Sequence, residues 1–538
     1  MISYTQKNFL VVDDFTEFRN SIKGMLRQIG ATNVDVATTG EETIQCCRKK
    51  KYDIILHDYN LGPGKNGQQV LEELILQKLL SPHTIFIMVT AENSLAMVMG
   101  AVEYEPDDYL TKPFNRAALL QRLDKLVERR EAMEAINSAA DKGQWAEMIR
   151  ACDELMQNNR RYAAMALRKK AFAMQQLNQR KALETLLRDT IAQRAVPWAL
   201  IMLGKLLLAQ GDAVQVEGLM NDAIRQFPQL PALYDVLAEA QIMLGQNAVA
   251  QSTIQEALKT SPRAIRRQMK LGTLAKTNGD LEVAVRAYRD AVDMGRGSCL
   301  KSPDNYINFV NMVNEQAAQS GAGTLDRRFQ EESMHMLAEV NKDYADDKSV
   351  LARSYLSQAQ TLKNSGKARE ADQWAKRAVE NIKSLPHFFA ADTALDIVKQ
   401  LNELGQGNAA HQVMKTCAEM YGDDPKIQQS LSQHEGGTEL LTQVNQARQM
   451  NKTGALLYEK RQFVEAMQPF REASDLQPRN ITIVLNAVQN LLQVMQLQPE
   501  ERESLKQECI KYLGNLNEMP PGDARYERFQ KLRRLVMS

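Results

Sequence analysis

The sequence predicts an α/β domain with a parallel sheet, followed by an all-helical repeat array. Over roughly the first 130 residues, apolar runs alternate with amphipathic stretches, which is the order typical of a parallel sheet covered by helices. Beyond residue 110 the strand signal ends and glycines recur at a constant step, which is typical of helical repeats. A chain of 538 residues is also too long for one hydrophobic core.

Five apolar segments predict the strands of the sheet. They are residues 8–12, 33–37, 52–57, 84–89 and 108–110. The helices are expected at 16–29, 40–51, 68–80 and from 115 to about 129. In a parallel α/β sheet the binding site forms at the carboxyl ends of the strands. The residues that directly follow each strand are therefore the candidate functional residues.

Those residues form a chemically coherent set. Asp13 and Asp14 follow the first strand, Asp58 the third, Thr90 the fourth and Lys112 the fifth. Converging carboxylates repel one another unless a cation lies among them, and a hard divalent ion such as Mg²⁺ suits oxygen ligands. A lysine and a hydroxyl stabilise a transferring phosphoryl group, and a carboxylate can act as its nucleophile. The set therefore predicts phosphoryl transfer to a carboxylate.

Several segments also resemble, in order, the signature motifs of receiver domains: VVDDF, YDIILHDYNLGPG, VTAEN and DDYLTKPF. The resemblance covers roughly the first 125 residues and implies a flavodoxin-like fold with a five-stranded parallel sheet, ending at residue 128. It implies that Asp58 is the phospho-acceptor and that Asp13 and Asp14 are the Mg²⁺-binding acidic pair. It further implies that the backbone carbonyl of Asn60 completes the metal shell.

The same resemblance assigns the residues that respond to the phosphate. It makes Thr90 the switch hydroxyl, Tyr109 the switch aromatic residue and Lys112 the cation that pairs with the phosphate. Pro113 stands where receiver domains have a cis-proline. The expected response repacks the face made by the fourth helix, the fifth strand and the fifth helix.

Two residues near Asp58, Asp53 and His57, could also take part in the chemistry of the site. Asp53 is a rival acceptor, but it stands at the start of the third strand and therefore at the wrong edge of the sheet. His57 precedes the acceptor, where receivers more often have an apolar residue. Strand alternation places it on the opposite side from Asp58, so we expect a structural histidine and no part in proton transfer.

The helical region shows a step of 34 residues, since Gly211, Gly245 and Gly279 give 245 − 211 = 279 − 245 = 34. The same step backwards reaches Gly143, with the intermediate glycine missing at Leu177–Asn178. This is the tetratricopeptide (TPR) period, in which each unit is a pair of antiparallel helices. The sequence predicts a TPR-like superhelix over 129–538. The best units lie at about 195–295, 350–380 and 450–480, the pattern is degraded at 296–350 and 380–450, and loops are expected at 320–324 and 434–438.

A stack of helical pairs forms a concave surface that binds proteins. We therefore expect a response regulator of a phosphorelay, in which a sensor histidine kinase or a phosphotransfer protein phosphorylates Asp58 and so switches the interactions of the array with an unidentified partner. The alternative is an auxiliary regulator, or phosphate sink, that binds and modulates a sensor kinase or another response regulator. Both a monomer and a homodimer fit these expectations.

Other outputs fit the sequence less well. Lys and Arg number 67 against 66 Asp and Glu, a net charge of +1 that gives no reason to expect nucleic acid or a membrane. Residues 256–258 spell the tripeptide of cyclic-di-GMP phosphodiesterases, but they fall within a repeat helix. We expect neither a catalytic output nor a transcription factor.

The six cysteines have no metal-ligand spacing, which with the lack of a signal segment predicts a cytoplasmic protein. The basic stretch 525–534 is expected to be a capping helix.

Overall fold

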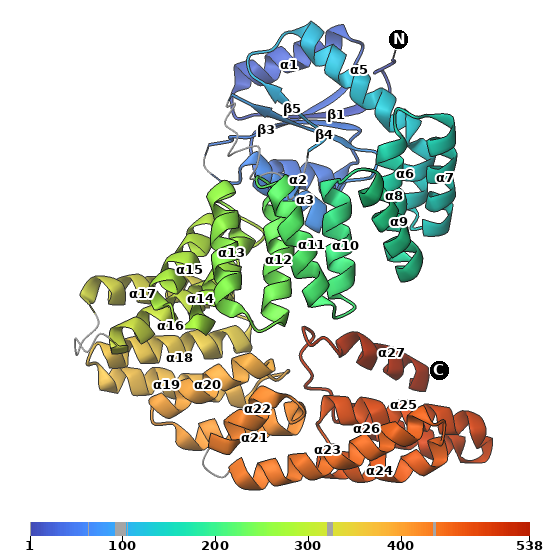
Figure 1. Cartoon of the computed structure of the whole chain (residues 1–538). Coiled ribbons are helices and arrows are strands. Elements are labelled where there is room, and N and C mark those ends of the chain that lie inside the picture. The colour runs from blue at the N-terminus through green and yellow to red at the C-terminus, as the bar shows by residue number, and fades with distance from the viewer. Residues whose placement is uncertain are drawn as a thin grey trace. The chain divides into compact units, whose positions relative to one another are not determined.

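The computed structural model of the chain describes residues 2–62, 64–91, 104, 106–319, 326–433 and 437–537. The chain divides into two compact units, Met1–Asn305 and Tyr306–Ser538. The first unit holds the sheet domain and a series of helical pairs, and the second is all-helical over its described residues. Figure 1 shows the order of these elements along the chain.

The first unit begins with a five-stranded parallel sheet in the order β2-β1-β3-β4-β5. The strands are β1 (Asn8–Val12), β2 (Asn33–Ala37), β3 (Ile54–Asp58), β4 (Ile85–Thr90) and β5 (Asp108–Thr111). The predicted sheet is confirmed. The third and fourth strands begin and end one or two residues later than expected, so that Asp58 and Thr90 are the last residues of their strands.

Two layers of helices cover the sheet (Figure 1). They are α1 (Thr16–Gln28) and α5 (Arg116–Ala132) on one face, and α2 (Gly40–Lys49) and α3 (Gly67–Leu76) on the other. Alternate strand residues make this possible, because Phe9 and Val11 join the core under α1 and α5, whereas Leu10 and Val12 join the core under α2 and α3. The fourth helix of the expected switch face lies outside the described residues.

Helix α5 leads almost directly into the helical region. It ends at Ala132, and α6 begins at Glu134 after the single residue Met133. No strand follows Thr111 among the described residues. The further helices of the first unit are α6 (Glu134–Asp141), α7 (Trp145–Asn158), α8 (Ala163–Gln176), α9 (Arg180–Gln193), α10 (Pro197–Leu208), α11 (Ala213–Gln226), α12 (Pro231–Met243), α13 (Asn247–Thr260), α14 (Ile265–Asn278) and α15 (Leu281–Gly295).

The second unit continues the pattern of paired helices. Helix α16 begins at Pro303, at the boundary of the units. The helices are α16 (Pro303–Gln319), α17 (Arg327–Asp343), α18 (Lys348–Asn364), α19 (Ala368–Lys383), α20 (Ala391–Glu403), α21 (Gly407–Tyr421), α22 (Pro425–Gln433), α23 (Gly437–Glu459), α24 (Phe463–Leu476), α25 (Ile481–Leu497), the 3-10 turn η2 (Pro499–Glu501), α26 (Arg502–Gly514) and α27 (Tyr526–Met537).

The 34-residue step corresponds to the turn inside each helical pair. Gly211, Gly245 and Gly279 have φ values of 86°, 75° and 75°, a left-handed conformation that glycine adopts without steric cost. Asn178, where the glycine is missing, has φ 55° and makes the same turn. A second constraint sets the helix crossing: a Cβ atom on Gly454 would lie 2.8 Å from the ring of Phe470. The glycines recur every 34 residues because each helical pair needs a left-handed turn at that position.

The stretch 296–350, whose pattern is degraded, nevertheless folds into helices α16 and α17 and the start of α18. Its core contains polar side chains: Asn314 Nδ2 donates to Thr361 Oγ1 at 3.0 Å, and both residues are buried. The loop expected at 320–324 lies outside the described residues. Of the loop expected at 434–438, residues 434–436 lie outside the described residues, and Gly437 and Thr438 belong to α23.

Three smaller expectations can be compared with the fold. Ala257, within the phosphodiesterase-like tripeptide, is buried in α13 as a packing residue. All six cysteines are free thiols, and only Cys299 is exposed. Among the described residues, no helix is both long and apolar enough to cross a bilayer.

A candidate phospho-acceptor site at the strand ends

The predicted acidic residues converge at the carboxyl ends of β1 and β3. These strands are neighbours and parallel, so the residues that end them meet at one edge of the sheet. One carboxylate oxygen each of Asp13, Asp14 and Asp58 lies within 4.8 Å of the other two. Asp13 and Asp58 are buried, with 1% and 6% exposure, whereas Asp14 faces solvent. The structure therefore brings together the three carboxylates that the sequence singled out.

Lys112 lies between two of these acids. Its Nζ is 2.6 Å from Oδ2 of Asp13 and 3.0 Å from Oδ2 of Asp58. The backbone holds it there, because Lys112 N donates to the carbonyl oxygen of Thr90 at 2.8 Å and so extends the pairing of β4 with β5. The ammonium group also lies 4.2 Å from the ring centroid of Phe18. The lysine thus offsets part of the negative charge of the pocket.

Even with Lys112 present, the pocket disfavours the ionised form of Asp58 beside Asp13 and Asp14. Burial raises the pKa of Asp58 to about 6, and the charges of Asp13 and Asp14 act in the same direction. The hydrogen bond and the charge of Lys112 oppose this rise. A pocket that keeps three carboxylates together against this cost is suited to a further cation.

The donor set fits Mg²⁺. Carboxylate oxygens are the ligands this ion prefers, and at a bond length of 2.0–2.1 Å two oxygens on opposite sides of it are about 4.2 Å apart. The 4.8 Å spread of the three carboxylates is close to that limit. The loop after β3 wraps closely, since a Cβ on Gly62 (φ 69°) would lie 3.4 Å from Oδ2 of Asp14. Asn60 is exposed in this loop, and its carbonyl ligand role stays a prediction.

His57 and Gly67 both lie close to the backbone carbonyl oxygen of Asp58. His57 is fully buried, and its Nδ1 lies 2.7 Å from the carbonyl oxygen of Asp58, to which it donates. The imidazole stacks on Phe86 with ring centroids 5.6 Å apart, and burial lowers the pKa of His57 to about 4, so the ring is neutral at pH 7. A Cβ atom on Gly67 would lie 2.6 Å from the same oxygen. A glycine-rich loop is the only feature of the sequence that points to this role of Gly67.

The other site residues occupy the expected strand positions. Thr90 ends β4 and is largely buried. Tyr109 lies in β5 and packs, partly buried, against the core under α2 and α3. Peptide Lys112–Pro113 is cis. Asp53 lies at the other end of β3, where its Oδ2 accepts the backbone N–H of Asn8 at 2.7 Å, so it is remote from the acidic pocket.

A doubly wound parallel sheet whose strand ends carry three carboxylates and a lysine is the arrangement of a receiver domain. Residues 9–124 match the model of the response regulator receiver domain family. Over 120 residues the chain is 32% identical to the chemotaxis protein CheY-3 of Vibrio cholerae, covering 22% of this chain and 91% of that protein. It is equally identical over 120 residues to CheY of Pseudomonas aeruginosa, covering 95% of that protein. The chain belongs to the response regulator receiver family.

Solved structures resemble the two parts of the chain separately. CheY4 of Vibrio cholerae is 27% identical, with 23% of this chain and 99% of that chain covered and a TM-score of 0.21. The C-terminal part of a TPR repeat-containing protein from Cytophaga hutchinsonii is 15% identical, with 48% of this chain and 95% of that one covered and a TM-score of 0.36. In this chain, Gly211, Gly245 and Gly279 make left-handed turns 34 residues apart, which is the period of TPR repeats.

Proposed function

We propose that this chain is a phosphorelay response regulator in which Asp58 accepts a phosphoryl group and thereby switches the protein interactions of the helical array. The observation that carries this proposal is the position of Lys112, whose ammonium group lies within 3.0 Å of the carboxylates of both Asp13 and Asp58. The receiver comprises residues 1–128 and the TPR-like array residues 129–538.

Each residue of the pocket has a separate role in phosphoryl transfer. Oδ of Asp58 attacks the phosphorus of a phosphohistidine on a sensor kinase or phosphotransfer protein, so that a P–O bond forms while the P–N bond breaks. Lys112 pairs with the incoming phosphoryl oxygens, and Asp13 and Asp14, with the Asn60 carbonyl, would hold Mg²⁺. The ion supplies charge neutralisation for the phosphoryl group. Thr90 then donates its hydroxyl to the phosphate and Tyr109 follows it inward. The chain receives phosphate and catalyses no reaction on a separate substrate.

The first unit offers a route from this pocket to the repeats. Asn66 caps the start of α3, and one turn along it Gln69 Nε2 donates to the carbonyl oxygen of Met294 in α15 at 3.4 Å. The guanidinium group of Arg266, in α14, lies 6.0 Å from the ring centroid of Tyr104. A cavity of about 640 Å³ lies between these contacts, and Tyr59, next to the acceptor, lines it. Movement of the loop after β3 would therefore act directly on α14 and α15.

A second set of contacts holds the start of the array. The guanidinium group of Arg130 pairs with Asp107 at 2.6 Å and donates to the carbonyl oxygen of Thr84 at 2.7 Å. Arg161, which precedes α8, pairs with Glu128 of α5 at 2.6 Å. These pairs lie near the amino ends of the strands, away from the phosphorylation pocket. They join the start of the array to the receiver, and the contact of α3 with α14 and α15 is the one nearer to the pocket.

Phosphorylation by a small phosphodonor tests this function. The full chain is incubated with acetyl phosphate, with and without Mg²⁺, and phosphate-retarding gels compare wild type with Asp58→Ala. We expect a Mg²⁺-dependent retarded band that the variant lacks. Hydrogen exchange on the two forms should then differ at residues 261–268 as well as in the receiver. Absence of the band in folded wild type contradicts the proposal, and exchange differences confined to residues 1–128 contradict the route to the repeats.

A further inference from the structure

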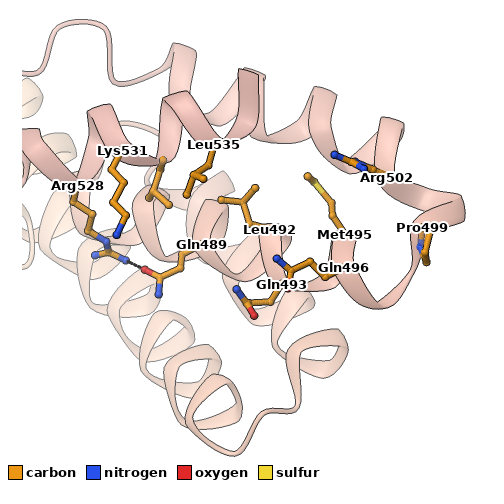
Figure 2. A pocket seen from close by; sticks show the side chains of 11 residues that line it. Gln489, Leu492, Gln493, Met495, Gln496, Pro499, Arg502, Arg528, Lys531 and Leu535 are labelled. Carbon is orange, nitrogen blue, oxygen red and sulfur yellow. Dashed lines mark hydrogen bonds between the residues drawn. The ribbon is translucent and has the colours of Figure 1, made fainter. Parts of the chain in front are cut away.

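The strongest feature that the receiver does not explain is a concave pocket of about 820 Å³ near the C-terminal end of the array. Figure 2 shows it between α25 and α27, with Arg502 and Pro499 at one end. Its volume lies in the range of pockets that bind ligands, and is large enough for several side chains of a peptide. The pocket lies wholly within the second unit, so it needs no other part of the chain.

The charged side chains that line the pocket are all positive. Arg502, Arg528 and Lys531 line it, and no acidic side chain does. None of the three cations makes an ion pair within the described part of the chain. Arg528 donates instead to neutral amides, at 2.8 Å to Asn486 Oδ1 and at 2.7 Å to Gln489 Oε1, the second of which is the dashed line in Figure 2. Burial lowers the pKa of Arg528, so its charge is held at a cost that no carboxylate offsets.

The remaining lining combines apolar and amide groups. Leu492 and Met495 of α25 and Leu535 of α27 supply aliphatic surface, and Leu535 is 51% exposed. Gln493 and Gln496 lie on the same face of α25, and neither side-chain amide makes a hydrogen bond within the described residues. Glutamine amides both donate and accept, so they can pair with a peptide backbone. Methionine adapts its shape to different apolar side chains.

We propose that this pocket binds an acidic peptide segment of a partner protein, with a carboxylate paired to Lys531 or Arg502 and an aliphatic side chain against Leu492 and Leu535. This rests on the proposed protein-interaction role of the array and names the partner chemistry of one part of it. A nucleic acid fits less well, because no aromatic side chain lines the pocket on which a base could stack. A membrane surface is flat, whereas this surface is concave.

A matched pair of charge reversals on α27 tests the proposal. Lys531 lines the pocket, and Arg533, two residues along the same helix, is exposed and does not line it. Full-length Lys531→Glu and Arg533→Glu carry the same change in net charge. Both are applied with wild type to an array of 12-residue peptides that permute glutamate and leucine positions, each printed beside its Glu→Gln counterpart. The affinity for the best peptide is then measured by fluorescence anisotropy.

We expect peptides that contain both glutamate and leucine to bind wild type, their Glu→Gln counterparts to bind at least about tenfold more weakly, and Lys531→Glu to lose about tenfold in affinity. Arg533→Glu should stay within about twofold of wild type. Equal losses in both variants, or no preference for glutamate, overturn the proposal. So does binding of anionic phospholipid vesicles or a single-stranded oligonucleotide that depends on Lys531 while the peptides fail. Asp58→Ala is measured in the same peptide assay. Peptide binding by this variant would support the pocket even if phosphorylation of Asp58 were disproved.

Discussion

A Cβ atom on Gly67 would lie 2.6 Å from the carbonyl oxygen of Asp58. Gly67 is the first residue of α3, and its backbone N–H donates to the carbonyl oxygen of Tyr59 at 2.8 Å. The start of α3 is therefore pressed against the backbone of the candidate acceptor and of the residue after it. Any side chain at position 67 must displace the acceptor strand, Met88 or His57.

Gly67→Ala should therefore both destabilise the receiver and slow the phosphorylation of Asp58. We expect a loss of roughly 1–3 kcal/mol in the free energy of unfolding, as for overpacked cores. Gly24→Ala in α1 is the control, because nothing lies within 4 Å of its added Cβ and alanine favours a helix. Urea denaturation and the initial rate of phosphorylation are measured for both. Two variants with equal rates and stabilities would show that the contact at Gly67 does not matter.

Replacing Lys112 should slow phosphoryl transfer much more than it changes stability. The ammonium group is the cation nearest to both buried carboxylates, and losing a charged donor to a transferring group typically costs roughly 10²-fold or more in rate. We expect Lys112→Ala to fold and to accept phosphate from acetyl phosphate roughly 10²-fold more slowly. Lys125→Ala, an exposed lysine of α5, is the control. A rate within about threefold of wild type would remove Lys112 from the mechanism.

Mg²⁺ should stabilise the chain through Asp14. A ligand that binds only the folded state adds about 2.7 kcal/mol at 100 times its dissociation constant, which raises the melting temperature of the domain that binds it. Asp14 is exposed, so Asp14→Asn removes a ligand without opening a cavity. We expect wild type and Glu17→Gln, an exposed acid of α1, to melt higher in Mg²⁺, and Asp14→Asn to show little change. An equal shift in all three would place the ion elsewhere.

The turns of the repeats should respond to substitution according to their backbone angle. Gly245 has φ 75°, so Gly245→Ala is expected to cost about 1–2 kcal/mol. Asn178 holds a similar conformation at φ 55°, and Asn178→Gly should be neutral or stabilise by a few tenths of a kcal/mol. Chemical denaturation of the full chain, followed by circular dichroism at the helical minimum, measures both. A stabilising Gly245→Ala would contradict the turn assignment.

The sequence predicts the site well wherever strand position alone determines it. Asp13, Asp58, Thr90 and Lys112 each end or follow a strand, and parallel pairing then forces them to one edge of the sheet. It does not predict that Lys112 contacts both Asp13 and Asp58, because that depends on the path of a long side chain. Likewise, strand alternation predicts that His57 lies on the side opposite to Asp58. It does not predict the hydrogen bond from His57 to the carbonyl oxygen of Asp58.

The repeats are predictable where small and apolar residues recur, and less so where polar residues fill the core. Gly272 and Tyr288, for example, form a close crossing within α14 and α15, where an added Cβ would lie 2.9 Å from the ring. Around α16 and α18, Asn314 and Thr361 occupy buried positions and hydrogen-bond to each other. Buried polar side chains break the apolar periodicity on which the prediction depends, although the helices form.

Chemical trapping of the phosphorylated residue shows directly whether Asp58 is the acceptor. Borohydride reduces an acyl phosphate to the corresponding alcohol, so phosphorylated protein is reduced, digested and sequenced by mass spectrometry. We expect Asp58, and no other aspartate, to become homoserine, and only when phosphodonor and Mg²⁺ are both present. Homoserine at Asp13 or Asp53, or none in folded protein treated with donor and Mg²⁺, would contradict it.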